Sequence, residues 1–309
     1  MTTLRKFLEN CNIDADIAYD EPMASHTTFR IGGPADAFVK PRSAEAFSAL
    51  LRAAREAGVP VAIIGGGANL LVADRGIRGI VASTEALCET RLAGDGTLFA
   101  GAGVPVVELV RLALREGRSG LEFAAGLPGS VGGAVYMNAR CYEREFADIL
   151  VTVDYIEGAD FSYRSTTMER AGWAYKRTPF MAGGALADSL VTGATFATGI
   201  GERTHIAARM AELEADRAAK GHFDFPSAGS LFKNNRAFGK PTGKILDELG
   251  FRGKRIGDAM VSPRHANIFI NAGHASAADM AALIEEAQAA ARTAFGMELE
   301  PEVIRLGDF

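Results

Sequence analysis

The sequence predicts an α+β protein built from several α/β subdomains, and three observations support this class. A β-α-β pattern opens the chain, because the helix expected at 43–58 leads directly into an apolar strand at 59–64. From about residue 67 to 200 the pattern changes to short apolar strands separated by glycines. A charged amphipathic helix at 202–220 then leads into a final region with two further helices.

The helices expected in the first two thirds carry their own boundary signals. At 43–58, Ser43 can cap the N-terminus and Gly58 can close the C-terminus. At 105–116, Pro105 suits the first turn, where its missing N–H is not needed. Short apolar strands are expected around these helices, at 59–64, 70–72 and 79–81.

The final region is expected to hold helices at 242–249 and 276–295. Ser276 with Asp279 resembles a capping box in which Asp replaces the usual Glu. The helix at 202–220 is expected to carry the chain into this region, so the last third reads as a domain of its own.

Composition and charge narrow the class of function. Apolar residues at 48% and charged residues at 23% are ordinary for a soluble protein, and a net charge of −5 without a basic run gives no nucleic-acid partner. Cys11, Cys88 and Cys141 have no metal-ligand spacing, so reduced thiols are expected and a metal is not. Neither a signal core nor a membrane-length apolar run is apparent. We therefore expect a soluble cytoplasmic protein.

Two glycine-rich loops are candidates for binding an anion. The first runs through 65–71, directly after the 59–64 strand, and the second lies at 126–134. Backbone N–H groups of residues without side chains can converge on a phosphate, although neither loop fits the standard nucleotide fingerprints. Tight turns alone are the alternative for a single loop. A third segment at 30–35 favours a pyrophosphate site, because that group needs donors from more than one side.

The segment 226–234 contains the strongest catalytic signal in the chain. Ser230 follows a small-residue turn, and Lys233 and Asn234 come shortly after it. A hydroxyl proton donor beside a cation and an amide suits a reaction on an anionic substrate. The structural alternative is a turn serine whose hydroxyl is bonded to its own backbone.

These segments resemble the flavin-binding domain of the vanillyl-alcohol-oxidase-like superfamily, a PCMH-type FAD-binding fold. Within it they are most similar to the UDP-N-acetylenolpyruvoylglucosamine reductase (MurB) family. The resemblance implies two α/β FAD-binding subdomains at 1–66 and 67–200, and a C-terminal α/β substrate-binding domain at 201–309. Residues 299–309 are candidates to return to the FAD domain. The matching segments are 28–35, 65–71, 126–138, 226–234, 257–271 and 299–303.

The resemblance also implies an activity. NADPH would reduce non-covalently bound FAD, which then passes hydride to the enolpyruvyl ether of UDP-N-acetylglucosamine to give UDP-N-acetylmuramate. This reaction belongs to peptidoglycan synthesis, and so to cell-wall biogenesis, cell shape and cell division. The implied partners are the UDP-linked enolpyruvyl amino sugar and NADPH, with no membrane or nucleic acid, and the expected state is a monomer. An FAD-dependent oxidase and a non-catalytic flavin-binding protein remain the alternatives.

The resemblance further implies which residues hold the ligands. Lys233, Asn234 and Asn267 are expected to bind substrate, although a structural cap or turn fits Asn267 equally well. The expected FAD-binding residues lie in three segments and are Arg30, Ile31, Gly32 and Gly33; Ile64, Gly65, Gly66, Gly67, Ala68, Asn69 and Leu70; and Gly126, Pro128, Gly129, Ser130, Gly132 and Gly133.

The resemblance assigns the proton donor to Ser230 and the catalytic glutamate to Glu302. Apolar residues after Glu302 make its segment a buried strand that could carry the carboxylate inward. Glu300, two residues earlier, would share its face in an extended strand and is a weaker candidate.

The third catalytic position departs from the family pattern Tyr-Arg-x-Ser-x-Phe. Here 175–180 reads Tyr-Lys-Arg-Thr-Pro-Phe, which places Lys176 at the arginine position and leaves Arg177 as the alternative. Lysine keeps the charge but loses the bidentate fork on a carboxylate. We expect this segment to be a strand, in which these two adjacent side chains point to opposite faces and cannot both enter the site.

Three further features bear on the site. At 138–143 the chain reads Asn-Ala-Arg-Cys-Tyr-Glu where the family favours Asn-Ala-Gly-Ala-Tyr-Gly, which can alter the loop beside the flavin. Between Phe196 and Ser230 there is room for one helix, so the insertion that closes a tyrosine over the substrate is expected to be absent, as in the shorter subtype. Three histidines are expected at the surface, namely His205, His222 and His274.

Overall fold

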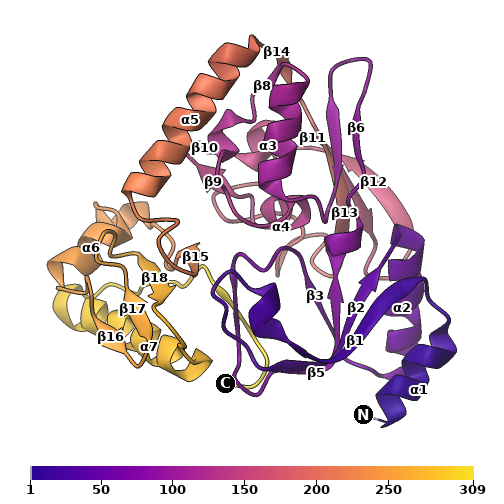
Figure 1. Cartoon of the computed structure of the whole chain (residues 1–309), viewed down its shortest axis with the longest axis horizontal. Coiled ribbons are helices and arrows are strands. Elements are labelled where there is room, and N and C mark those ends of the chain that lie inside the picture. Colours follow the sequence, from indigo (N-terminus) through magenta and orange to yellow (C-terminus); the bar gives the residue numbers. More distant parts are fainter. Residues whose placement is uncertain (1) are drawn as a thin grey trace. The chain divides into compact units, whose positions relative to one another are not determined.

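The computed structural model describes residues 2–309, which form two compact units (Figure 1). Unit 1 contains the residues up to Asp20 together with Asp36–Gly66 and Gly79–Glu214. Unit 2 contains Glu21–Ala35, Gly67–Arg78 and Ala215–Phe309. Each unit is therefore assembled from segments that lie far apart in the sequence. Within residues 2–309, no helix combines the length and the apolar character needed to span a bilayer.

The first sheet of unit 1 has the strand order β1-β2-β5-β3. Helix α2 packs on it, because Phe47 and Leu50 of the helix share one buried core with Val39 and Ile80 of the strands. Ser43 accepts a hydrogen bond from the N–H of Ala46 and so caps the helix, as predicted. The elements are α1 (Thr2–Cys11), β1 (Ala15–Pro22), β2 (Pro34–Pro41), α2 (Ala44–Ala57), β3 (Val61–Ile64) and β5 (Ile77–Ser83).

The second sheet of unit 1 is antiparallel, with the order β12-β11-β13-β7-β6. Its core contains an aromatic cluster, in which the Phe146 ring meets the rings of Phe123 and Phe196 edge to face, each with centroids 5.8 Å apart. Helices α3 and α4 contribute Leu109 and Val135 to the same core. The elements are β6 (Thr90–Leu92), β7 (Leu98–Gly101), α3 (Val106–Arg115), α4 (Val131–Tyr136), β11 (Leu150–Ile156), β12 (Tyr163–Thr167) and β13 (Leu190–Phe196).

Short elements complete unit 1 and lead out of it. Two small ladders pair β8 with β14 and β9 with β10. Helix α5 begins in unit 1 and ends in unit 2, and its Met210 and Leu213 are buried in the core of unit 1. The bounds are β8 (Arg118–Ser119), β9 (Arg140–Cys141), β10 (Arg144–Glu145), β14 (Gly199–Ile200) and α5 (Arg203–Ala219). Within residues 2–309, 3-10 helices span Met23–His26, Thr84–Ala86, Glu122–Ala124, Phe146–Asp148 and Arg236–Phe238.

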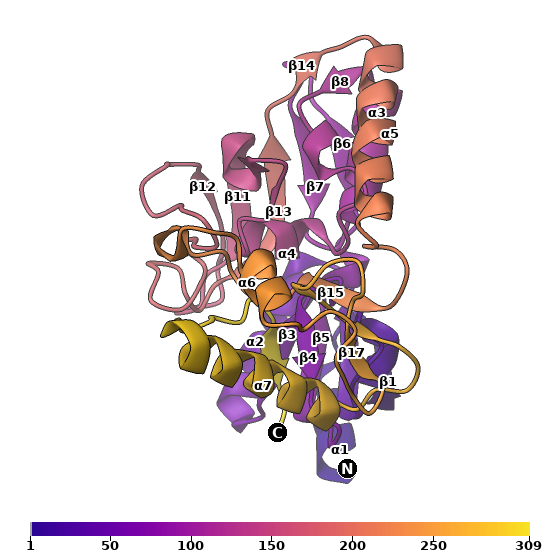
Figure 2. The ribbon, with the colours of Figure 1, turned by 90° about the vertical axis from the view of Figure 1, so that its left-hand side faces the viewer.

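Unit 2 contains a four-stranded sheet in the order β15-β18-β17-β16 (Figure 1). Helix α7 packs against β16 and β17, and Figure 2 shows this helix along its length. A separate parallel pair joins β4 to β19, with Leu70 opposite Ile304. The elements are β4 (Leu70–Val72), β15 (Ser227–Ser230), α6 (Thr242–Glu248), β16 (Arg255–Ile256), β17 (Ala259–Val261), β18 (Ile268–Asn271), α7 (Ala277–Phe295) and β19 (Ile304–Leu306).

The helices predicted from sequence are confirmed, with ends that shift by about one residue. The capping box at α7 is present in full: Ser276 Oγ accepts from the N–H of Asp279, and the Asp279 carboxylate accepts from the N–H of Ser276. The aspartate therefore performs the function of the usual glutamate.

Candidate active site

In unit 1 the two predicted glycine loops lie against each other. The N–H of Gly66 donates a 3.1 Å hydrogen bond to Oγ of Ser130, whose residue is only 4% exposed. A Cβ on Gly66 would lie 2.9 Å from Cα of Gly129 and from N of Ser130, so only glycine permits this approach. The structure thus brings together two predicted phosphate-binding segments that are 64 residues apart.

Part of the second loop is committed to the fold. The N–H groups of Val131 and Gly132 donate 2.9 Å hydrogen bonds to the carbonyls of Val104 and Ala102. These two amides hold the loop against the segment before α3 and cannot also bind a ligand. The groups of this loop that remain candidates for binding a ligand are therefore those next to Gly66, namely Gly129 and Ser130.

Lys176 lies in a tight turn instead of a strand. The backbone groups of Ala174 and Arg177 hydrogen-bond to each other at 3.0 Å in both directions, and Lys176 has φ of +53° between them. The strand premise for this segment was therefore wrong, and the opposite-face argument does not apply to it. Lys176 is partly buried and Arg177 is exposed. This difference favours Lys176 over Arg177 for the predicted arginine position.

The buried residue Asn138 links the turn at 174–177 to the end of α4, the helix that begins in the second glycine loop. Asn138 has no exposed surface, and its Nδ2 donates a 2.9 Å hydrogen bond to the carbonyl of Ala174. Its Oδ1 accepts from the N–H of Ala147 at 3.0 Å. Thr178 adds a 2.9 Å bond from its hydroxyl to the carbonyl of Tyr136, the last residue of α4. Lys176 is thereby positioned by the same unit that carries the paired glycine loops.

The departure from the family pattern at 138–143 produces a strained hairpin. Tyr142 and Glu143 form the two-residue loop between β9 and β10, with φ of +50° and +65°. Such turns favour Asn-Gly or Gly-Gly, because side chains with a Cβ are disfavoured at positive φ. The Tyr142 hydroxyl donates a 2.8 Å hydrogen bond to the carbonyl of Leu213 in α5, which holds this loop in place.

In unit 2 the predicted flavin turn at residues 30–33 is tightly bonded. Arg30 has φ of +55°, and its N–H donates to the carbonyl of Thr27. The Thr27 hydroxyl is buried and donates a 2.9 Å bond to the carbonyl of Ile31. Gly33 then donates from its N–H to the carbonyl of Ala73, just after β4. These bonds hold a conformation that is unfavourable for arginine.

The start of the segment 67–70 lies beside the residues that precede this turn. Gly67 has φ of +61°, and an added Cβ would lie 1.9 Å from the carbonyl oxygen of His26, so no other residue fits. The N–H of Thr28 donates to the carbonyl of Gly67 at 3.1 Å. Asn69 then reaches the segment before β19, donating from Nδ2 to the carbonyl of Glu302 at 2.9 Å.

The segments of Ser230 and Glu302 are paired within unit 2. The N–H of Glu302 donates a 2.7 Å hydrogen bond to the carbonyl of Leu231, and Phe232 lies opposite Pro301 in an antiparallel bridge. The residue next to Ser230 is thus bonded directly to Glu302. Both Ser230 and Glu302 are partly exposed, as a residue that must meet a substrate needs to be.

The three predicted substrate-binding residues have different surroundings. Lys233 Nζ lies 2.5 Å from the Glu300 carboxylate, which is 69% exposed. Asn234 Oδ1 accepts a 2.9 Å bond from the N–H of Thr242 at the start of α6. Asn267 is 2% exposed, and its amide accepts from the N–H of Phe232 at 3.0 Å and donates to the carbonyl of Phe232 at 2.8 Å. Both asparagines therefore hold backbone that surrounds the serine segment.

A pair of histidines lies near this segment in unit 2. Burial, and then the charge of Arg217, lower the pKa of His222 to about 4, and burial also lowers the pKa of His265. Their ring centroids are 6.3 Å apart, and His265 Nδ1 accepts a 3.1 Å bond from the N–H of Asn267. The expectation of a surface position was wrong for His222, which is partly buried, and is confirmed for His205 and His274.

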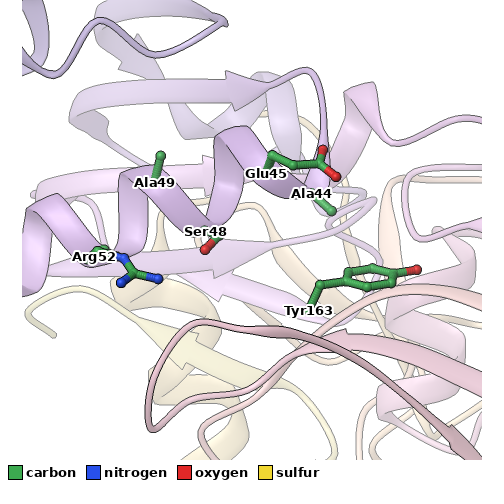
Figure 3. A pocket seen from close by; sticks show the side chains of 6 residues that line it. All are labelled: Ala44, Glu45, Ser48, Ala49, Arg52 and Tyr163. Carbon is green, nitrogen blue, oxygen red and sulfur yellow. The ribbon is translucent and has the colours of Figure 1, made fainter.

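A cavity of about 330 Å³ lies in unit 1, and none of the residues that line it is a predicted site residue (Figure 3). Its polar groups already serve the fold, since Ser48 Oγ donates to the carbonyl of Phe161 and Arg52 donates to that of Asp160. Burial, with a hydrogen bond to Asp154, raises the pKa of Tyr163 to about 12, so this phenol stays protonated. The cavity is lined by Ala44, Glu45, Ser48, Ala49, Arg52 and Tyr163.

Comparison with known proteins agrees with this arrangement. Residues 35–161 match a family described as FAD binding domain, and residues 221–306 match the C-terminal domain of UDP-N-acetylenolpyruvoylglucosamine reductase. A reductase of that name from Treponema denticola is 38% identical over 322 aligned positions, covering 100% of both chains. One from Agathobacter rectalis is 40% identical and covers 94% of each.

A solved structure supports the fold. The crystal structure of UDP-N-acetylenolpyruvylglucosamine reductase (MurB) from Thermus caldophilus superimposes with a TM-score of 0.77 at 32% identity, covering 95% of this chain and 99% of that one. The predicted α+β class, with a vanillyl-alcohol-oxidase-like FAD-binding fold and a C-terminal domain, is confirmed, and so is FAD as a cofactor. The chain belongs to the UDP-N-acetylenolpyruvoylglucosamine reductase family.

Proposed function

We propose that this protein uses NADPH to reduce UDP-N-acetylglucosamine enolpyruvate to UDP-N-acetylmuramate, in the cytoplasmic stage of peptidoglycan synthesis. Membership of the reductase family supports the substrate class. The observation that carries the catalytic assignment is the 2.7 Å hydrogen bond from Glu302 to Leu231, because it sets the glutamate segment beside the serine segment.

Each unit, taken by itself, contains predicted FAD-binding residues whose groups fit this cofactor. In unit 1 the Ser130 hydroxyl accepts from the N–H of Gly66 and keeps its own hydrogen to donate, which suits a pyrophosphate, and the glycines at 66 and 129 allow the two loops to approach closely. In unit 2 the turn at 30–33 supplies a cation and glycine backbone. When bound, FAD supplies the hydride that originates from NADPH.

Ser230 is assigned the proton transfer. Addition of hydride to the terminal vinyl carbon of the substrate leaves negative charge on the neighbouring carbon, next to the carboxylate. Ser230 Oγ donates its proton to that carbon, which completes the new C–H bond and leaves the serine to recover a proton from solvent. Glu302 helps to stabilise the enolate and orients the donor Ser230, and Lys176 holds the substrate carboxylate through its charge.

Lys233 is assigned to anionic groups of the substrate, and its ion pair with Glu300 limits its rotamers. Asn234 and Asn267 are assigned to the substrate pocket through the backbone that they hold. Between Phe196 and Ser230 the chain forms β14 and α5, which supports the shorter subtype without a closing tyrosine.

Anaerobic stopped-flow absorbance tests the proposed reaction. NADPH should bleach the flavin, and subsequent UDP-N-acetylglucosamine enolpyruvate should restore its absorbance, whereas UDP-N-acetylglucosamine should not. A flavin that NADPH cannot reduce would indicate a non-catalytic binding protein. In a separate assay in air, oxidation of an alcohol without NADPH, with reduction of oxygen to hydrogen peroxide, would indicate an oxidase.

A further inference from the structure

Strand β18 has a buried asparagine at each end of a five-residue stretch. Asn267 precedes the strand and Asn271 ends it, and they are 2% and 4% exposed. Asn267 holds the backbone of Phe232 in the serine segment. Asn271 hydrogen-bonds to the backbone of Phe29 and Arg30, which are about 240 residues away in the sequence.

The amide of Asn271 is fully engaged within the protein. Its Nδ2 donates to the carbonyl of Phe29 at 3.1 Å and to that of Arg30 at 3.5 Å. Its Oδ1 accepts from the N–H of Gly273 at 3.1 Å and of Ala275 at 3.0 Å. A carboxamide has two donor hydrogens and two acceptor lone pairs, so no capacity is left for a ligand. Asn271 can act only through the backbone that it holds.

The backbone around Arg30 requires such support. Its φ of +55° lies in the left-handed region, which is unfavourable for a residue with a Cβ. The carbonyl and N–H of one peptide unit point in opposite directions, so fixing the carbonyls of Phe29 and Arg30 also fixes the N–H groups of Arg30 and Ile31. Those N–H groups donate to Thr27, through its carbonyl and its hydroxyl.

We propose that Asn271 is a positioning residue for the flavin turn at 30–33, and that β18 spaces this turn from the serine segment. Four strand rises of about 3.3 Å place the two asparagines about 13 Å apart. The asparagine at one end orients the turn, and the one at the other end orients Phe232, two residues from Ser230. This inference rests on the proposed assignment of residues 30–33 to the flavin.

Two isosteric variants, Asn271→Asp and Asn267→Asp, form a matched pair for the test. Each retains the oxygen that accepts a backbone N–H and replaces the donating Nδ2 with an oxygen that faces a backbone carbonyl. We expect Asn271→Asp to raise the Kd for FAD about tenfold or more and to change the visible circular dichroism of the bound flavin. We expect Asn267→Asp to keep FAD affinity near the wild-type value but to slow reoxidation of the flavin by substrate.

A pH series separates positioning from general damage to the fold. Burial beside two carbonyls raises the pKa of a carboxyl at position 271, and the protonated form can donate a hydrogen bond again. The FAD affinity of Asn271→Asp should therefore recover as the pH falls, whereas wild type should show no such recovery. If Asn271→Asp does not fold, the neutral Asn271→Ser should show the same selective loss of FAD affinity.

Hydrogen exchange of the apoprotein tests the inference without flavin. Residues 29–33 should exchange faster in Asn271→Asp than in wild type, and residues 230–234 faster in Asn267→Asp. If hydrogen exchange becomes faster at these residues in the variants but wild type does not bind FAD, the positioning role stands and the proposed function is rejected. Two results would overturn the inference. One is that Asn271→Asp has the FAD affinity of wild type and the same hydrogen exchange at 29–33; the other is that both variants lose FAD affinity equally.

Discussion

Asn69 donates a 2.9 Å hydrogen bond from Nδ2 to the carbonyl oxygen of Glu302, although 233 residues separate the two in sequence. The carbonyl of Asn69 also accepts the N–H of Ile304 at 2.9 Å, so Asn69 binds the chain on both sides of Val303. On its other edge Glu302 is bonded to Leu231. The proposed catalytic acid is therefore held between a predicted cofactor loop and the proposed proton donor's segment.

Replacement of Ser230 by alanine should affect only one half of the reaction. NADPH should bleach the flavin at the wild-type rate, while reoxidation by substrate should slow by roughly 10²–10⁴-fold, because the positioned proton donor is gone. Single-turnover stopped-flow absorbance measures both steps. Ser227→Ala, at the other serine of β15, is the control and should reoxidise normally. Rapid reoxidation of Ser230→Ala would show that another group donates the proton.

Glu302→Gln should also slow reoxidation, by about a hundredfold, because an amide cannot replace the carboxyl group that is assigned to stabilise the enolate and orient Ser230. The matched control is Glu300→Gln, which breaks the exposed ion pair with Lys233 and should change the rate by less than about fivefold. The two variants are compared in the same single-turnover assay. If the larger loss appears in Glu300→Gln, the catalytic role belongs to Glu300.

Lys176→Met should lower kcat/KM for the enolpyruvyl substrate by about tenfold to a hundredfold, because a charged hydrogen bond to the carboxylate is lost. Arg177→Met should stay near wild type, since Arg177 is exposed at the turn. Steady-state kinetics of both variants decide between the two cations. A larger loss in Arg177→Met would reverse the assignment.

Glu143→Gly should stabilise the protein by about 1 kcal/mol in its free energy of unfolding. Glu143 has φ of +65° in a two-residue hairpin loop, where glycine avoids the cost of a Cβ. Urea denaturation followed by circular dichroism measures the difference. Glu143→Ala keeps a Cβ and serves as the control, which should bring no comparable gain. Equal gains in both variants would trace the effect to the lost carboxylate instead.

His222 should make stability depend on pH below neutrality. Burial, and then Arg217, lower its folded-state pKa from 6.5 to about 4, so between these values the unfolded chain binds a proton that the folded chain does not. Its contribution is complete above pH 6.5 and is lost as the pH falls toward 4. The other charged groups acting on it are His265, Lys220 and Asp216.

Urea denaturation from pH 7 to 4 tests this linkage. His222→Gln should show a shallower decline in the free energy of unfolding than wild type over that range. His205→Gln is the control, because the His205 side chain is 83% exposed and should leave the slope unchanged. An unchanged slope in His222→Gln would contradict the assigned shift.

Local signals predicted the helices because the groups that end a helix are its sequence neighbours. Ser43 and Gly58 bracket α2, and Ser276 with Asp279 begins α7. The motif residues were found in the same way, since 226–234 and the glycine loops are short contiguous strings. The roles of these residues and the three-domain division remain predictions.

The partners of these segments could not be predicted from local signals. Nothing near Asn271 indicates that its amide binds Phe29, because that contact depends on the completed fold of unit 2. The segment around Lys176 was predicted to be a strand because the sequence gives no turn signal there. The residue with the positive φ is a lysine, whereas a glycine would have indicated a turn. Once the structure is known, each buried asparagine can be recognised by the backbone groups that it satisfies.

The parallel pairing of β4 with β19 has a consequence for synthesis on the ribosome. Residues 70–72 are made roughly 230 residues before their partners at 304–306, a delay of roughly 10–50 s at ordinary elongation rates. All segments of unit 1 precede residue 215, so that unit can assemble while translation continues. In unit 2 the edge of β4 stays unpaired until residue 306 has emerged from the ribosome. An unpaired strand edge can pair wrongly, so the nascent chain is most exposed to misfolding during that interval.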